Sequence, residues 1–374
     1  MKIREFGVEQ WMNHYETRCD WNLAETCIES LTVAQLLSLS GKGNAFLDEL
    51  LPMKLTYGAI EGSDRLRSAI ASLFEHQASE NVTVTHGAIG ANALIYQTLV
   101  EPGDVVVSVV PTYQQHYSIP ESLGADVRIL RLQQKDDFLP DLDRMQELVK
   151  GGAKLISLTN PNNPTGALID RPMLEDIVSI ARDAGAWILC DEVYRGIDQE
   201  GDGFTASIAD LYEKGISTGS MSKAYSLAGL RLGWVVAPKE IIHAVSVHRD
   251  YNTISVGMID DYLAALALEN RDKVLARGRG IVRGNLAMLS EWVEAEPRIS
   301  WVKPRSGTTA ALRYDFDLPS EALCIRLLEQ TGVMLTPGSA LDMEGYLRIG
   351  YANSPEILRE GLARMTPFLK EISR

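Results

Sequence analysis

Short apolar runs recur through the middle of the chain and alternate with segments of helical spacing. The runs are rich in Val and Ile and are apolar at successive positions, which is typical of strands buried on both faces of a largely parallel sheet. Between them, 142–152 and 171–185 have helical spacing and end in Gly, a common helix stop. We therefore predict a layered α/β domain over residues 46–245. Seven strands are expected in it, at 82–85, 104–110, 126–132, 154–159, 186–192, 215–220 and 232–238.

The last third of the chain has a different pattern. Residues 259–296 predict one or two long helices, and 299–314 and 346–353 contain strand-like runs. Helical spacing returns at 320–332 and 354–373. These patterns predict a smaller α+β domain over residues 246–374, including the long connecting helices. Residues 1–45 are expected to form an arm that packs with this domain or with a neighbouring subunit.

Composition narrows the class of protein. The chain has 374 residues, of which 45% are hydrophobic and 23% are charged, as in ordinary globular proteins. A net charge of −14 without any basic tract argues against binding to nucleic acid or to an anionic membrane surface. Four cysteines form no CxxC motif and no metal-like cluster with the six histidines, so they predict reduced, buried thiols. We found no signal peptide and no membrane-spanning run, and we expect a soluble, cytoplasmic protein.

Ligands of open α/β sheets bind beyond the carboxyl ends of the strands, so the residues that follow each run are candidates. After the first run, small residues open a helix whose free amides, at Gly87, Ala88, Ile89 and Gly90, can bind an anion. A plain glycine turn is the alternative interpretation. Tyr113 follows the second run, where it offers an aromatic face unless it is simply a core or surface tyrosine.

Two further strand ends carry polar side chains. The loop "NPNNPTG" (160–166) has two prolines and three asparagines, which make it rigid and rich in hydrogen-bonding groups, and we assign it a function. Asp191 and Glu192 end an apolar strand, where an unpaired carboxylate is costly, so a structural partner or a bound cation must compensate for each. Tyr194 follows at the same edge.

A single lysine, Lys223, lies in the small-residue stretch "GSMSKAYSLAGLRLGW" (219–234), with Ser220, Ser222 and Arg231 around it. A buried lysine commonly forms a salt bridge, but desolvation also lowers the lysine pKa and makes the amine a nucleophile towards carbonyls. Together the five strand ends offer a phosphate cradle, an aromatic face, an amide, a carboxylate and a lysine. These are the groups needed to hold pyridoxal 5'-phosphate.

The motifs "NPNNPTG", "DEVY" and "SMSKAYSLAGLRLGW" resemble those of the class I/II aminotransferases of the aspartate aminotransferase superfamily, which are fold-type I pyridoxal-phosphate enzymes. The resemblance extends over residues 57–352. It implies an α/β fold: a three-layer α/β/α large domain with a seven-stranded, mostly parallel sheet, and a smaller α+β domain. It also implies a homodimer whose active sites are shared across the interface.

The resemblance also implies a role for individual residues. Lys223 is expected to be the Schiff-base lysine and the acid/base that moves a proton between the substrate Cα and the cofactor C4′. Asp191 is expected to pair with the ring nitrogen, and Arg348 with the substrate α-carboxylate. The remaining roles are Asn163 and Tyr194 at the ring 3-oxygen, Asn163 also beside the substrate, Tyr113 on the ring face, Ala88, Ile89, Ser220 and Arg231 at the phosphate, and Tyr57 at the phosphate of the neighbouring subunit.

Specificity is less clear from the sequence. Relatives that act on dicarboxylates carry a second arginine from the partner subunit, and Arg249 is the only candidate for it here. Trp21 and Glu25 lie in "RCDWNLAETCIES" (18–30), a segment that closes over the substrate in relatives. They could line the pocket, where a carboxylate would favour a basic substrate; a solvated helix face is the alternative.

The expected activity is transfer of an amino group from an L-amino acid to a 2-oxo acid. A second hypothesis keeps the cofactor but breaks another bond, in β-elimination, decarboxylation or cyclisation of an amino acid. A third is a non-catalytic regulator that binds pyridoxal phosphate. Such regulators usually accompany a basic DNA-binding domain, for which this acidic chain has no room.

Overall fold

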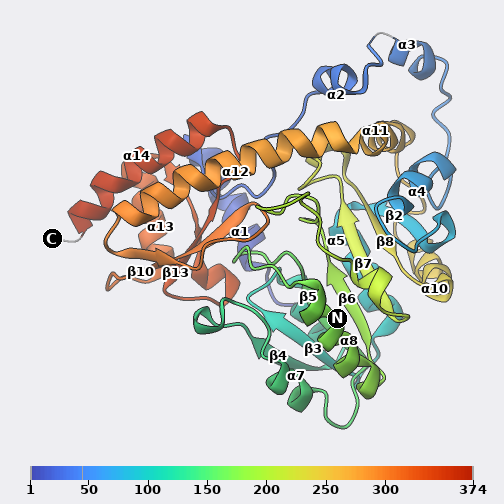
Figure 1. Cartoon of the computed structure of the whole chain (residues 1–374), viewed down its shortest axis with the longest axis horizontal. Coiled ribbons are helices and arrows are strands. Elements are labelled where there is room, and N and C mark those ends of the chain that lie inside the picture. Colours follow the sequence, from blue (N-terminus) through green and yellow to red (C-terminus); the bar gives the residue numbers. More distant parts are fainter. Residues whose placement is uncertain (1, 44, 373–374) are drawn as a thin grey trace.

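A seven-stranded sheet forms the larger half of the computed structural model, which describes residues 2–43 and 45–372 (Figure 1). The strand order is β2-β8-β7-β6-β5-β3-β4, and only β8 runs antiparallel to its neighbours. All seven predicted strands and the mostly parallel sheet are confirmed. The strands are β2 (Val82–His86), β3 (Val105–Val110), β4 (Asp126–Arg131), β5 (Leu155–Thr159), β6 (Trp187–Asp191), β7 (Gly215–Ser220) and β8 (Leu232–Val236).

Alternate residues of the central strands enter two different cores, which explains why the runs are apolar at successive positions. Val107 and Ile156 pack on the face covered by α8 (Arg171–Ala184). Val106 and Leu155 pack on the opposite face, under α5 (Gly87–Leu99) and α10 (Lys239–Arg249). Helices on both faces complete the three predicted layers. The sheet also has α6 (Gln115–Ser122), α7 (Leu142–Leu148) and α9 (Ile208–Leu211) at its periphery.

A second sheet of four antiparallel strands lies at the other end of the molecule (Figure 1). Its order is β12-β13-β10-β9, and α13 (Ser320–Thr331) and α14 (Pro355–Ile372) pack beside it. The long α12 (Arg271–Ala295) connects it with α11 (Met258–Glu269), as the pattern over 259–296 predicts. The strands are β9 (Ile299–Trp301), β10 (Thr309–Tyr314), β12 (Thr336–Pro337) and β13 (Tyr346–Gly350). The exact domain boundaries stay a prediction.

The N-terminal arm spans both halves. It contains α1 (Gly7–Tyr15), the 3-10 turn η1 (Glu16–Arg18) and β1 (Trp21–Asn22), which pairs in parallel with β11 (Val333–Met334). A solvated helix face for residues 18–30 is therefore wrong: Trp21 belongs to a strand whose partner lies 312 residues away in the chain, and its ring lies under Arg364. Trp21 does not line the catalytic cavity described below.

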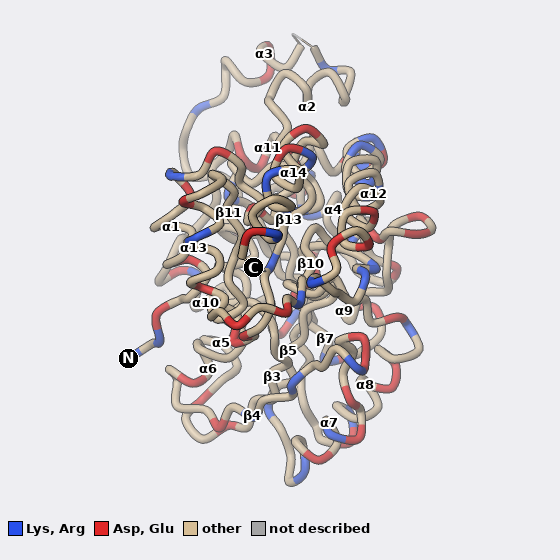
Figure 2. The backbone as a smooth tube through the Cα atoms, turned by 90° about the vertical axis from the view of Figure 1, so that its left-hand side faces the viewer, with Lys and Arg blue, Asp and Glu red and all other residues tan. Residues whose placement is uncertain are grey.

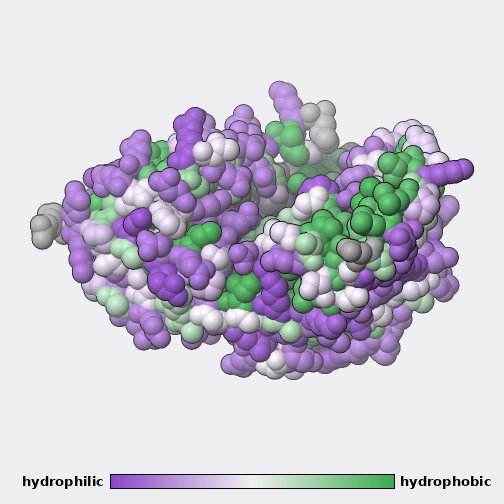
Figure 3. Space-filling model, turned by 90° about the horizontal axis from the view of Figure 1, so that it is seen from above, coloured by the Kyte–Doolittle hydropathy of each residue, from purple (hydrophilic) through white to green (hydrophobic). Residues whose placement is uncertain are grey.

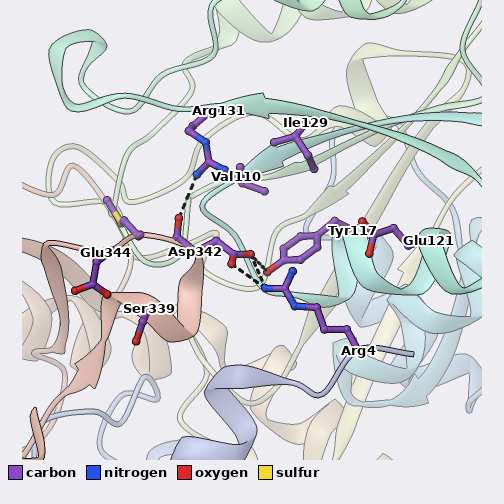
Figure 4. Close-up of a pocket in the computed structure, with 10 residues that line it drawn as sticks. Arg4, Val110, Tyr117, Glu121, Ile129, Arg131, Ser339, Asp342 and Glu344 are labelled. Carbon is purple, nitrogen blue, oxygen red and sulfur yellow. Dashed lines mark hydrogen bonds and ion pairs between the residues drawn. The ribbon is translucent and has the colours of Figure 1, made fainter. Parts of the chain in front are cut away.

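The start of the arm is fastened at a cleft between the halves (Figure 4). Arg4 Nη2 donates to both carboxylate oxygens of Asp342 at 2.8 and 2.9 Å, and Tyr117 Oη donates to the same carboxylate at 2.8 Å. Deeper in the arm, Gln114 donates to the Glu5 carbonyl and accepts from the Gly7 amide. Because Tyr117 and Gln114 belong to the large sheet's half and Asp342 to the other, the arm ties the two halves together.

Three more helices, α2 (Val33–Ser40), α3 (Ala45–Leu50) and α4 (Asp64–Ala71), follow the arm, and α2 and α3 project from the top of the molecule (Figure 1). Acidic and basic residues are interspersed over the surface elements (Figure 2). Within the described residues, no helix combines the length and the apolar character needed to cross a membrane. All four cysteines are free thiols as predicted, but only Cys190 and Cys324 are fully buried.

Candidate active site

A cavity of about 430 Å³ lies beyond the carboxyl ends of β3, β5, β6 and β7, between the large sheet and the N-terminal arm. It brings together ten of the residues predicted to hold the cofactor or the substrate, most of them because parallel strands deliver their C-terminal loops to one edge. The residues are Ala88, Ile89, Tyr113, Asn163, Asp191, Tyr194, Ser220, Lys223, Arg231 and Arg348.

One end of the cavity is built to hold an anion. Helix α5 begins at Gly87, and neither a capping side chain nor an acidic residue occupies its first turn, so its amides and positive dipole end are available. Arg231 lies beside it, so close that a Cβ at Gly87 would come within 2.9 Å of Arg231 Nη2. A Cβ at Gly233 would meet the Gly87 carbonyl carbon at 2.3 Å. Both glycines are therefore required for the cradle, which fits the phosphate of pyridoxal phosphate.

Asp191, the last residue of β6, is 5% exposed, accepts two hydrogen bonds and lies beside a histidine. Asn92 Nδ2 donates to its Oδ2 at 2.8 Å, the Val193 amide donates to its Oδ1 at 3.2 Å, and His116 Nε2 lies 3.4 Å from Oδ2. These contacts orient the carboxylate at the cavity wall, as pairing with a pyridinium nitrogen requires. Our sequence analysis missed Asn92 and His116, although a lone polar residue on the apolar face of α5 could have indicated Asn92.

The neighbouring Glu192 has a structural role. Its carboxylate accepts hydrogen bonds from Ser207 Oγ at 3.0 Å, from the Ile208 amide at 2.9 Å and from Ser217 Oγ at 2.8 Å. Burial raises the pKa of Glu192. Of the two carboxylates that end the strand, Glu192 is compensated by protein donors, and Asp191 alone lines the cavity.

Lys223 Nζ donates to Thr26 Oγ1 at 2.6 Å and lies 3.4 Å from Cys27 Sγ. Burial acts to lower the Lys223 pKa, but Cys27, Tyr194 and Glu25 raise it by more, so the pKa lies above its ordinary value. Groups of the arm thus oppose the lowering by desolvation that the sequence predicts. The reason is tertiary: the arm places Thr26 and its neighbours beside a lysine about 200 positions later.

Arg348 lies on β13 and is 3% exposed. Its Nη2 donates to Thr336 Oγ1 at 3.0 Å and to the Ala24 carbonyl at 3.2 Å, and Nη1 lies 3.5 Å from Asn163 Oδ1. Within the described chain, its Nε is buried without a hydrogen-bond partner. Burial lowers its pKa, which reflects the cost of a desolvated cation. A guanidinium with an unused donor in a cavity wall fits a carboxylate ligand.

Two tyrosines complete the cavity wall. Tyr113 Oη donates to Glu9 Oε1 at 2.6 Å, and the Tyr113 ring packs against Phe6 with centroids 4.6 Å apart. Tyr194 is 2% exposed and lies near Lys223 and Arg348. Burial raises the pKa of both phenols, so both are neutral donors near pH 7.

Two predicted residues lie outside this cavity. Arg249 is 1% exposed, and its Nη1 donates to Thr83 Oγ1 at 2.7 Å and to the Val84 carbonyl at 3.2 Å. These bonds hold it against β2 of its own chain, and its candidate role at the partner's substrate stays a prediction. Tyr57 is 77% exposed and distant from its own cavity, so its role across a subunit interface stays a prediction.

The cavity also contains residues of the arm that the sequence patterns did not single out. Val8, Glu9, Met12 and Glu16 come from α1 and η1. Residues 9, 12 and 16 are three and four positions apart, which places them on one face of a helix. This spacing could have indicated that they act together.

Comparisons with known proteins agree with this arrangement. Residues 48–365 match the model of the family "Aminotransferase class I and II". A pyridoxal-phosphate-dependent aminotransferase structure from Streptococcus suis 89-1591 superposes with a TM-score of 0.97 and 41% identity over 100% of both chains. Capreomycidine synthase of Streptomyces vinaceus is 29% identical over 96% of this chain and 92% of its own length. An aspartate aminotransferase of Pyrococcus horikoshii is 30% identical over 78% of this chain and 76% of its own.

Proposed function

The chain belongs to the class I and II aminotransferase family of pyridoxal-phosphate-dependent enzymes, and we propose that it moves an amino group from an L-amino acid to a 2-oxo acid. One observation carries the proposal. A single cavity holds the amine of Lys223 together with the buried guanidinium of Arg348, whose Nε has no partner among the described residues. An amine for a carbonyl and a guanidinium for a carboxylate are what an amino-acid site needs.

When bound, pyridoxal phosphate supplies an aldehyde and a ring that takes up the electron pair of a broken Cα bond. The protein's part is to hold and orient. Asp191, oriented by Asn92, would pair with the ring nitrogen, and Arg348 and Asn163 would hold the substrate α-carboxylate. Lys223 Nζ would take the proton from the substrate Cα. Asn163 and Tyr194 would bond the ring 3-oxygen, Tyr113 would cover the ring face, and the phosphate would be held by Ala88, Ile89, Ser220 and Arg231.

We expect Lys223→Ala to abolish turnover and the visible absorbance of the lysine-bound cofactor, because no other side chain of the cavity offers an amine. Borohydride treatment followed by peptide mass spectrometry should locate the cofactor on the peptide that contains Lys223. Lys223→Arg, which keeps the positive charge, serves as the matched control and should be equally inactive. Turnover retained in Lys223→Ala would contradict the assignment.

A second candidate is a cyclisation or another elimination on the same residues, which the similarity to capreomycidine synthase over 96% of the chain favours. The two reactions differ in their products. Mixing the enzyme with an amino acid alone should give one equivalent of 2-oxo acid and a lasting spectral change if it is an aminotransferase. An eliminating enzyme would regain its starting spectrum, and it would release ammonia or a cyclic product.

We further propose a homodimer in the cytoplasm. Apolar side chains gather on the face seen in Figure 3, around the projecting α2–α3 segment. A monomer rarely leaves such a patch open, and a second copy of the chain would cover it. Four free thiols fit a reducing compartment. The exposed apolar side chains of residues 47–60, which include part of α3 and the segment after it, are Leu47, Leu51, Leu55, Tyr57 and Ile60.

A further inference from the structure

Three carboxylates of the N-terminal arm line the catalytic cavity: Glu9 on α1, Glu16 at the start of η1 and Glu25 after β1. Met12 lines the cavity between the first two. Positions 9, 12 and 16 lie on one face of a helix, so α1 and the turn after it present this acidic face to the cavity.

These carboxylates line one cavity, and among the described residues none of them forms an ion pair, although Lys223 lies close enough to Glu25 to lower its pKa. The pKa of Glu16 is raised by burial and by the charges of Glu25 and Glu9, which shows that the three repel. Glu16 is exposed to solvent, and within the described residues its carboxylate has no hydrogen-bond or ion-pair partner. Glu9 accepts from the neutral Tyr113 phenol, and Glu25 accepts from the amides of Thr26 and Cys27 at 2.6 and 2.7 Å.

The cations of the same cavity serve other groups. Arg231 belongs to the anion cradle beside α5, and Lys223 is uncharged whenever it acts as an amine. Arg348 is 3% exposed with an unpartnered Nε, and it points independently to a carboxylate ligand. Once that carboxylate is bound, the three glutamates of the arm remain uncompensated.

We propose that the substrate is an amino acid with a cationic side chain, an ammonium or a guanidinium, whose charge lies against Glu9, Glu16 and Glu25. This proposal rests on the amino-acid chemistry assigned above to Lys223 and Arg348. The same carboxylates repel a dicarboxylic amino acid, and Arg249, which could have attracted one across the interface, is buried against β2. Selection for a basic side chain and against an acidic one therefore comes from the arm.

Binding can be measured without any reaction, by using acids that lack the α-amine. We would titrate the holoenzyme by calorimetry with 5-(trimethylammonio)pentanoate, whose quaternary nitrogen cannot form an imine, and with 5-guanidinopentanoate, pentanoate and glutarate, all at low ionic strength. At least one of the two cationic acids should bind about tenfold or more tightly than pentanoate, and glutarate should bind most weakly. Comparison of the two cationic acids tells an ammonium site from a guanidinium site.

Variants assign the effect to the arm. Glu16→Gln removes a charge without breaking a hydrogen bond, and it should weaken binding of the favoured cationic acid about three- to tenfold while pentanoate changes less than about twofold. Glu16→Lys should weaken it further and strengthen glutarate. Glu5→Gln is the matched control, since it removes one exposed charge of the same arm outside the cavity and should leave all four affinities unchanged.

The outcomes separate this proposal from the activity it rests on. Equal affinity for pentanoate and the cationic acids would overturn the proposal of a cationic substrate, and so would tighter binding of glutarate. An unchanged preference in Glu16→Gln would overturn it too. Each of these results would mean that another group, such as the partner subunit, neutralises the carboxylates of the arm. If the enzyme prefers the cationic acids but Lys223→Ala keeps its turnover, only the chemistry assigned to Lys223 is overturned.

Discussion

At the residue scale, the stability of the fold depends in part on a buried carboxyl group outside the cavity, Asp198, whose surroundings set its protonation. Asp198, in the loop after β6, is 7% exposed, and Ser306 Oγ donates to its Oδ1 at 2.6 Å. Burial raises its pKa to about 6 from an ordinary value of 3.8. The folded state favours the protonated acid, so the charged form of Asp198 lowers the free energy of unfolding. This loss is complete above about pH 6, and it disappears as the pH falls to 3.8.

We therefore expect Asp198→Asn to raise the free energy of unfolding near pH 7.5 by up to about 3 kcal/mol, since an amide keeps the bond from Ser306 without a buried charge. The advantage over wild type should fall to roughly half at pH 5. Thermal unfolding at the two pH values measures it. Asp176→Asn, at an exposed position of α8, is the matched control; a gap that does not shrink with falling pH would contradict the prediction.

At the element scale, two contacts of different strength hold the start of the N-terminal arm. Gln114, which is 3% exposed, bonds the Gly7 amide and the Glu5 carbonyl at 2.9 and 2.8 Å. The Arg4–Asp342 pair is solvent-accessible, so most of its attraction is screened. Since α1 presents Glu9 and Glu16 to the cavity, loosening the arm should weaken substrate binding.

We expect Gln114→Ala to raise the KM for the amino acid about tenfold and Arg4→Ala only about twofold, because buried bonds to backbone groups are costlier to lose than an exposed ion pair. Cleavage of the arm by a dilute protease should increase in the same order. The visible absorbance of the bound cofactor is the internal control and should stay unchanged. A larger effect for Arg4→Ala would mean that the cleft of Figure 4, and not Gln114, holds the arm.

At the scale of the whole molecule, the apolar face around α2 and α3 leaves the single chain incomplete. Leu51 and Leu55 are 78% and 74% exposed, and Tyr57 is 77% exposed beside them. A dimer formed through this face would bury them, and Tyr57, which does not line its own cavity, would then be available to the cavity of the partner.

Mixing two inactive variants tests the shared site. Tyr57→Ala and Lys223→Ala should each be nearly inactive, but a refolded equimolar mixture should regain about a quarter of wild-type activity, because each mixed dimer contains one intact site. Sedimentation of the wild type should give twice the chain mass. A monomer in sedimentation, or no recovery in a mixture shown to contain mixed dimers, would contradict the shared site.

The sequence by itself determined the large sheet and the gathering of the cofactor residues. Strand periodicity is local, and parallel strands bring their C-terminal ends to one edge by geometry, so Asn163, Asp191 and Lys223 could be placed together before any coordinates were known. The reactive groups of a motif that is contiguous in the chain, such as residues 219–234, can also be identified from the local sequence alone.

The tertiary structure alone decided what the arm does to the site. The arm crosses from β11 to the large sheet through contacts between residues more than 100 positions apart, which no local pattern encodes. Those contacts moved Glu9 and Glu16 into the cavity, placed Trp21 in a strand, and brought Glu25 and Cys27 beside Lys223, whose pKa they raise. Likewise, Arg249 is buried by the packing of α10 on β2, because the burial of a charge depends on all the segments that surround it.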